Sequence, residues 1–100
     1  MATGLTVRLE KIVGEFAENK DLARDIRKDK IVPALMANRE IILDFGGVQA
    51  ATQSFIHALI SELMRDYGVE VLDKIAFKDC NETVQKIIEI VVDYMQHSDE

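Results

Sequence analysis

The chain has 100 residues, 48% of them hydrophobic and 30% charged, which suits one globular domain with a modest core and excludes a disordered protein. Its formal net charge of −6 at pH 7 argues against a nucleic-acid partner, whose phosphates require a basic surface. Because the sequence has no apolar run of membrane-spanning length, no leader-like start and a single cysteine, we expect a cytoplasmic protein with no membrane partner and no disulfide.

The first quarter of the chain predicts one strand followed by one helix. From Leu5 onward apolar and polar residues alternate, which favours a strand that continues through Val13 and stops at Gly14. Asn19 is a suitable N-cap for a helix that begins near Lys20, because its side chain can accept hydrogen bonds from the first free amides.

A proline interrupts the pattern of this helix. Pro33 removes a backbone donor and clashes with the preceding turn unless it lies in a first turn. We therefore expect either a kink or two short helices, the second starting near Val32 and burying Leu35 and Met36. The helix also carries interleaved charges that can pair at helical spacing, which predicts a solvated face rather than a phosphate-binding patch. These charges are Arg24, Arg27, Lys28 and Lys30 with Asp21, Asp25 and Asp29.

The second half of the chain predicts a buried strand, a long helix and a further strand. Three consecutive aliphatic residues in Ile41–Phe45 predict a central strand buried on both faces, which Gly46 and Gly47 end. Positions 52–67 have the wide apolar stripe of a helix, and a third strand region is expected over 69–72 and 74–77.

A last helix completes the predicted fold. It is capped by Asp79 or Asn81 and extends to Met95, and a frayed tail is expected at 97–100. The order of elements predicts a single α/β domain over 1–100, with a core of about 5–95. We expect a β-α-β-α-β-α sandwich with a mostly parallel sheet of three to four strands.

Two hydroxyl side chains open the long helix. Thr52 and Ser54 lie where free amides and the helix dipole favour a negative charge, beyond the carboxyl end of a strand. Either residue can serve as a helix cap or as an acceptor for a phosphoryl group. The sequence leaves both roles open.

The other reactive side chains have ordinary roles that compete with catalysis. Asp44 could hold a metal or act as a base, but a hydrogen bond to the Gly46–Gly47 turn is the simpler role, and that turn matches no phosphate-loop motif. His57 lies one turn from Ser54 without a readable orienting acid. Cys80 is expected to be a packed thiol. We expect no catalytic residue, no metal and no cofactor.

Four segments together resemble the STAS-like family of unknown function, which is related to the STAS domains of sulfate transporters and anti-sigma factor antagonists. The resemblance covers roughly 15–95. Its segments are AR-x-IR-x-x-x-IVPAL (23–35), IILDFGGV (41–48), TQSFIHALI (52–60) and IAFKDCN (75–81).

This resemblance implies a regulatory role without enzymatic activity. STAS domains carry Asp-Ser-Ser-Gly after their central strand, with a serine phosphorylated by a histidine-kinase-like ATPase. Here Ser54 falls at the regulated serine, Thr52 at the aspartate and Phe55 at the glycine.

Two hypotheses of different class follow. In the first, a histidine-kinase-like ATPase or an anti-sigma-type regulator docks at Thr52, Ser54, His57 and the loop from Gly46 and Gly47 to Gln53, and phosphorylation of Ser54 releases it. In the second, excess apolar surface on the last two helices forms a homodimer of a structural or toxin–antitoxin-type complex. A small hydrolase using Ser54 and His57 is the least favoured alternative.

Overall fold

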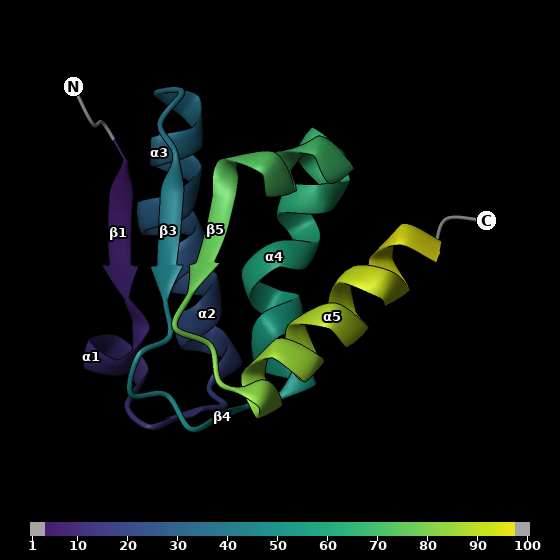
Figure 1. The fold of residues 1–100 in the computed structure, drawn as a ribbon. Helices are drawn as coiled ribbons and strands as arrows, with labels where there is room; N and C mark the ends of the chain where they lie inside the picture. Colours follow the sequence, from purple (N-terminus) through teal and green to yellow (C-terminus); the bar gives the residue numbers. More distant parts are fainter. Residues whose placement is uncertain (1–3, 98–100) are drawn as a thin grey trace.

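The computed structural model describes residues 4–97 and confirms a small α/β domain (Figure 1). The elements are β1 (Leu5–Arg8), α1 (Leu9–Val13), β2 (Phe16–Ala17), α2 (Lys20–Ile26), the π-helical turn η1 (Arg27–Ile31), α3 (Val32–Met36), β3 (Ile41–Asp44), β4 (Ala50–Ala51), α4 (Gln53–Tyr67), the 3-10 helix η2 (Val69–Lys74), β5 (Ile75–Lys78) and α5 (Glu82–His97). The expected frayed tail lies outside the described residues from position 98 onward, and α5 includes His97.

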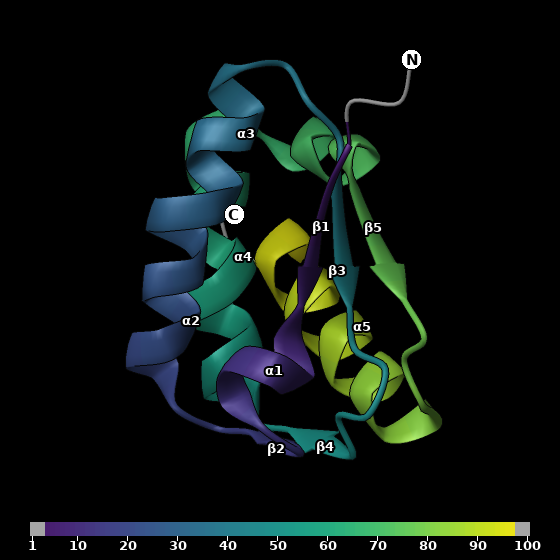
Figure 2. The ribbon, with the colours of Figure 1, turned by 90° about the vertical axis from the view of Figure 1, so that its left-hand side faces the viewer.

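The main sheet has three parallel strands in the order β1-β3-β5, which confirms the predicted mostly parallel sheet. Leu5, Ile41 and Ile75 share one register position, and β2 and β4 form a separate parallel pair. Helices α2, α3 and α4 cover one face of the sheet, and α5 packs beside α4 (Figure 2).

Only one face of the sheet is fully buried. Ile41 and Leu43 point toward the helices and are completely covered, as expected for an apolar inner face. On the other face Thr6 and Ala76 are exposed and Ile42, which lies between them, is only partly buried. The expectation that the central strand is buried on both faces was therefore wrong, because α2, α3 and α4 cover the sheet from one side (Figure 2).

The first strand is shorter than its alternating pattern predicts. β1 ends at Arg8, which is paired with Asp44, the last residue of β3. The pairing with β3 ends at that point, and the chain turns into α1 at Leu9. Leu9 then reaches the core with no exposed surface, while Ile12 remains 37% exposed. The spacing of Leu9, Ile12 and Val13 also fits one turn of a helix.

Pro33 is accommodated by two short helices joined through a π-helical turn. The amide of Val32 donates to the carbonyl of Arg27, five residues back, and this wider turn relieves the clash that Pro33 would cause in a regular helix. The predicted start near Val32 is confirmed. Leu35 is partly buried, but the prediction that Met36 is buried was wrong, because 78% of Met36 is exposed and Ala34 faces the core instead.

The segment after α4 is helical rather than extended. Gly68 has a φ of 83° and ends α4, as expected of a C-cap, and the amide of Val71 donates to its carbonyl. The predicted strand at 69–72 was wrong, because the sheet register places the first residue of β5 at Ile75, opposite the first residue of β3. Tyr67, expected in the buried stripe of α4, is 45% exposed.

Arg27 joins two helices instead of lying on a solvated face. Its guanidinium donates to the carbonyl of Ala58 at 2.6 Å and pairs with Glu62 at 3.3 Å, both on α4, and only 11% of its side chain is exposed. Arg24, by contrast, pairs with Asp21 on the same helix, and both side chains are more than half exposed. The expectation of a solvated charged face therefore holds for Arg24 and fails for Arg27.

Arg27→Ala is expected to lower the free energy of unfolding by about 1.5–2 kcal/mol, because a charge-assisted hydrogen bond in a nearly buried position is lost. The matched variant Arg24→Ala is expected to lower it by at most about 0.5 kcal/mol, since it removes an exposed ion pair. Urea denaturation followed by circular dichroism measures both values. Equal losses for the two variants would contradict the cross-link between α2 and α4.

Candidate functional site

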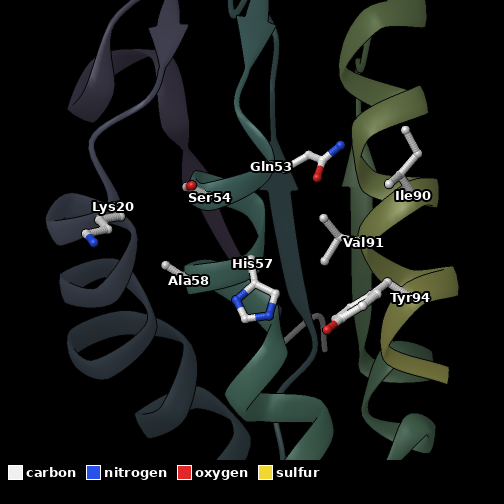
Figure 3. A pocket seen from close by; sticks show the side chains of 8 residues that line it. All are labelled: Lys20, Gln53, Ser54, His57, Ala58, Ile90, Val91 and Tyr94. Carbon is white, nitrogen blue, oxygen red and sulfur yellow. The ribbon is translucent and has the colours of Figure 1, made fainter. Parts of the chain in front are cut away.

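A groove of about 490 Å³ opens where the start of α4 meets α5 and the start of α2 (Figure 3). We call it the α4–α5 groove. It contains two of the predicted site residues, Ser54 and His57, on adjacent turns of α4. Its full lining is Lys20, Gln53, Ser54, His57, Ala58, Ile90, Val91 and Tyr94.

The two hydroxyl side chains at the start of α4 have different roles. Thr52 is the N-cap, and its Oγ1 accepts a hydrogen bond of 3.0 Å from the amide of Phe55. Ser54 is exposed and its side chain has no hydrogen bond with any residue from 4 to 97. The structure thus places Thr52 in the capping role and leaves the hydroxyl of Ser54 accessible in the groove.

His57 lies between the α2 side and the α5 side of the groove (Figure 3). It is half-buried, and its ring is tilted by 55° against that of Tyr94, with the ring centroids 6.5 Å apart. On α5, Ile90 and Tyr94 are 43% and 62% exposed, so the groove has an apolar wall open to solvent.

Sequence reasoning did not single out Lys20 or Tyr94 as site residues. One local signal was available for α5, because Ile90 and Tyr94 are four residues apart and lie outside the buried stripe of Val84, Ile88 and Val91. No comparable signal exists for Lys20, which reaches the groove only because α2 packs against α4.

The remaining predicted site residues lie at the carboxyl edge of the sheet and are not part of the groove lining. Asp44 Oδ1 accepts a hydrogen bond of 2.8 Å from the amide of Gly46, which is the simpler of the roles expected for this carboxylate. Gly47 has a φ of 88° and lies against Glu10, so a side chain there would be both strained and crowded. The turn therefore has a structural reason for its glycine.

Cys80 and Asn81 connect β5 to α5. Partial burial, together with the negative charges of Asp79 and Asp44, raises the pKa of the Cys80 thiol above its ordinary value. A raised pKa reduces the thiolate fraction at neutral pH, which agrees with the expected inert thiol. Asn81 rather than Asp79 caps α5, because Asn81 Oδ1 accepts a hydrogen bond of 2.8 Å from the amide of Val84.

The chemistry that the groove can support is limited by its charges. Its lining contains one lysine and one histidine and no carboxylate, so no acid of the lining orients His57 toward Ser54. Among residues 4–97 no three side chains of the kind that ligate metals come together. No helix in the same range is long and apolar enough to cross a membrane.

Comparison with known proteins gives one match. Residues 23–85 match a family described as a STAS-like domain of unknown function. The matched segment runs from the middle of α2 to the first turn of α5 and includes β3, α4 and β5, which agrees with the resemblance seen in the sequence motifs. No curated protein and no solved structure matches the chain.

The division of roles between Thr52 and Ser54 can be tested by stability. Thr52→Ala is expected to lower the free energy of unfolding by about 1 kcal/mol, because the first turn of α4 loses its cap. Ser54→Ala is expected to change it by less than about 0.5 kcal/mol, since the side chain has no partner within the described chain. Chemical denaturation of both variants gives the comparison, and a larger loss for Ser54→Ala would reverse the assignment.

Proposed function

Because this chain belongs to the family of STAS-like domains of unknown function, we propose that it is a non-catalytic regulatory module that binds a protein partner through the α4–α5 groove. The observation that carries the proposal is an accessible hydroxyl, Ser54, beside an exposed apolar wall formed by Ile90 and Tyr94. Partly exposed aromatic and aliphatic side chains at a groove are the usual contact points of protein interfaces.

The partner that we propose is a histidine-kinase-like ATPase or an anti-sigma-type regulator. This follows from the resemblance of positions 52–55 to the regulated segment of STAS domains, in which Ser54 takes the place of the phosphorylated serine. The chain departs from that segment at Thr52 and Phe55. Thr52 has the capping function that an aspartate also performs, and Phe55 is fully buried, so neither change obstructs Ser54.

Phosphorylation of Ser54 is the proposed switch. A phosphoryl group adds about −1.5 to −2 charges at neutral pH, and at the start of α4 the helix dipole and Lys20 partly offset that charge. The fold therefore tolerates the modification. The phosphoryl group places its charge directly beside the apolar wall, so a partner docked on Ile90 and Tyr94 is released.

Binding rather than catalysis is favoured by the composition of the groove. A serine nucleophile requires a histidine held by an acid and donors for a developing oxyanion, and the groove lining supplies His57 without the acid. The proposal therefore assigns His57 to packing with Tyr94 and to partner contact.

The switch is tested by affinity capture from lysate of the source cells with three immobilised proteins: wild type, Ser54→Ala and Ser54→Asp. We expect wild type and Ser54→Ala to retain an ATPase-like protein, identified by mass spectrometry, and Ser54→Asp to retain about tenfold less, because the carboxylate introduces charge at the interface. Equal recovery by Ser54→Ala and Ser54→Asp would exclude the switch, and loss of capture on Tyr94→Ala would locate the interface.

A second candidate function is self-assembly. The wall of Ile90 and Tyr94 continues on α5 into a shallow hollow lined in part by Ile88, Ile90 and Val92, which gives this helix apolar surface beyond what the core uses. A homodimer formed through α5 would bury this surface as part of a structural or toxin–antitoxin-type complex.

Size-exclusion chromatography with light scattering separates the two candidates. The partner-binding proposal predicts a monomer over the micromolar range, whereas self-assembly predicts a dimer that Tyr94→Glu dissociates, because a charge in the centre of an apolar interface is left unpaired. Gln85→Glu, an exposed position on the same helix that lines neither hollow, is the matched control.

A further inference from the structure

A second hollow, of about 460 Å³, runs along β1 at the edge of the sheet. We call it the β1 hollow. All four residues of β1 line it, together with side chains from α1, η1 and the ends of β3 and β5. β1 is the outermost strand of the sheet, and the two hollows share no lining residue (Figure 1).

The β1 hollow has a charge opposite to that of the whole chain. It contains four of the 12 lysines and arginines and one of the 18 acidic residues, so four positive charges minus one negative leave a local charge of +3 in a chain of net charge −6. The four cations, Arg8, Lys11, Lys30 and Lys78, come from four different elements and are all exposed. None of them forms an ion pair with another residue between 4 and 97.

The one acidic residue that lines the hollow, Asp44, already accepts a hydrogen bond from the chain itself. The amide of Gly46 donates a hydrogen bond to Asp44 Oδ1, and the side chain of Asp79 also lies close to Gly46. The carboxylates of Asp44 and Asp79 therefore gather at the loop. The cations along β1 remain available to a ligand from outside the chain.

The backbone of β1 is unpaired along the same hollow. β1 pairs with β3 only, and the amide of Leu5 donates to the carbonyl of Glu40 at 2.7 Å on that side. Because successive residues of a parallel strand point their backbone groups to opposite sides, the amides of Thr6 and Arg8 face the open edge. An open strand edge is a template for pairing with another extended chain.

We propose that the β1 hollow binds an extended, acidic segment of a protein partner, which adds to the sheet as a strand beside β1. Main-chain hydrogen bonds to Thr6 and Arg8 hold the segment, and its carboxylates contact Arg8, Lys11 and Lys30. Recognition by strand addition obtains affinity from the backbone and specificity from alternate side chains, and here the specificity is for negative charge. This site is independent of the α4–α5 groove and of the proposed switch at Ser54.

The charges also exclude other occupants of the edge. Pairing of β1 with β1 of a second copy would bring two sets of Arg8, Lys11 and Lys30 together, and like charges at an edge oppose such pairing. A nucleic acid would offer phosphates that can accept from the amides of Thr6 and Arg8, but it has no regularly spaced main-chain donors for the carbonyls of the strand edge, and the rest of the acidic chain would repel it.

The test uses an acetylated and amidated peptide in which glutamate alternates with valine or threonine, added to isotopically labelled protein. We expect the amide resonances of Thr6 and Arg8 to shift on titration, and the affinity to fall about tenfold in the double variant Arg8→Glu with Lys11→Glu. The double variant Arg65→Glu with Lys86→Glu, at exposed positions outside the hollow, is the matched charge control and is expected to bind as wild type does. Circular dichroism confirms that each variant is folded.

Two control ligands separate strand addition from simple attraction between charges. The same peptide with all its backbone amides N-methylated keeps its carboxylates but loses its main-chain donors, and we expect it to bind at least about tenfold more weakly. Equal binding of the N-methylated peptide or of a single-stranded oligonucleotide would overturn the proposal in favour of a general anion patch. Absence of any shift at Thr6 and Arg8 with the acidic peptide would overturn it outright.

Discussion

Burial of Ile41, Leu43 and Phe45 beneath the helices fixes β3 at the centre of the sheet, and the positions of both hollows follow from that. β1 and β5 take their register from β3, so all three strands end in one row. The chain leaves this row in short loops that start α1, β4 and α5 at one end of the molecule. Because α4 must cover the apolar face of β3, its first turn reaches the surface beside α5, where the groove forms.

The elements that the sequence predicted well are those whose pattern reflects their own burial. α4 and α5 have long apolar stripes, and the run of aliphatic residues in β3 predicted its central place in the sheet, though not the partial exposure of Ile42. The errors occur where a neighbour decides the structure. β1 stops because β3 stops, and the segment after Gly68 is helical because the sheet begins only at Ile75. The alternation of apolar and polar residues along a segment does not show where its neighbouring strand begins or ends.

The candidate site was predictable to the extent that its residues share one helix. Ser54 and His57 follow from helical spacing, and Thr52 follows from the preference of hydroxyl side chains for caps. Lys20 and Tyr94 enter the groove through the packing of α2 and α5 on α4, which depends on the whole fold. The basic character of the β1 edge could not be predicted from the sequence for the same reason, because its four cations are spread from position 8 to position 78 and only the fold brings them together.

The π-helical turn at Arg27–Ile31 and Pro33 depend on each other. Because the amide of Val32 bonds five residues back instead of four, this turn holds one residue more than a regular α-turn. Removing one residue there would restore regular helical bonding and bring the ring of Pro33 against the preceding turn. The extra residue therefore lets one helical path continue through a proline, while Arg27 at the start of the turn still reaches the carbonyl of Ala58 on α4.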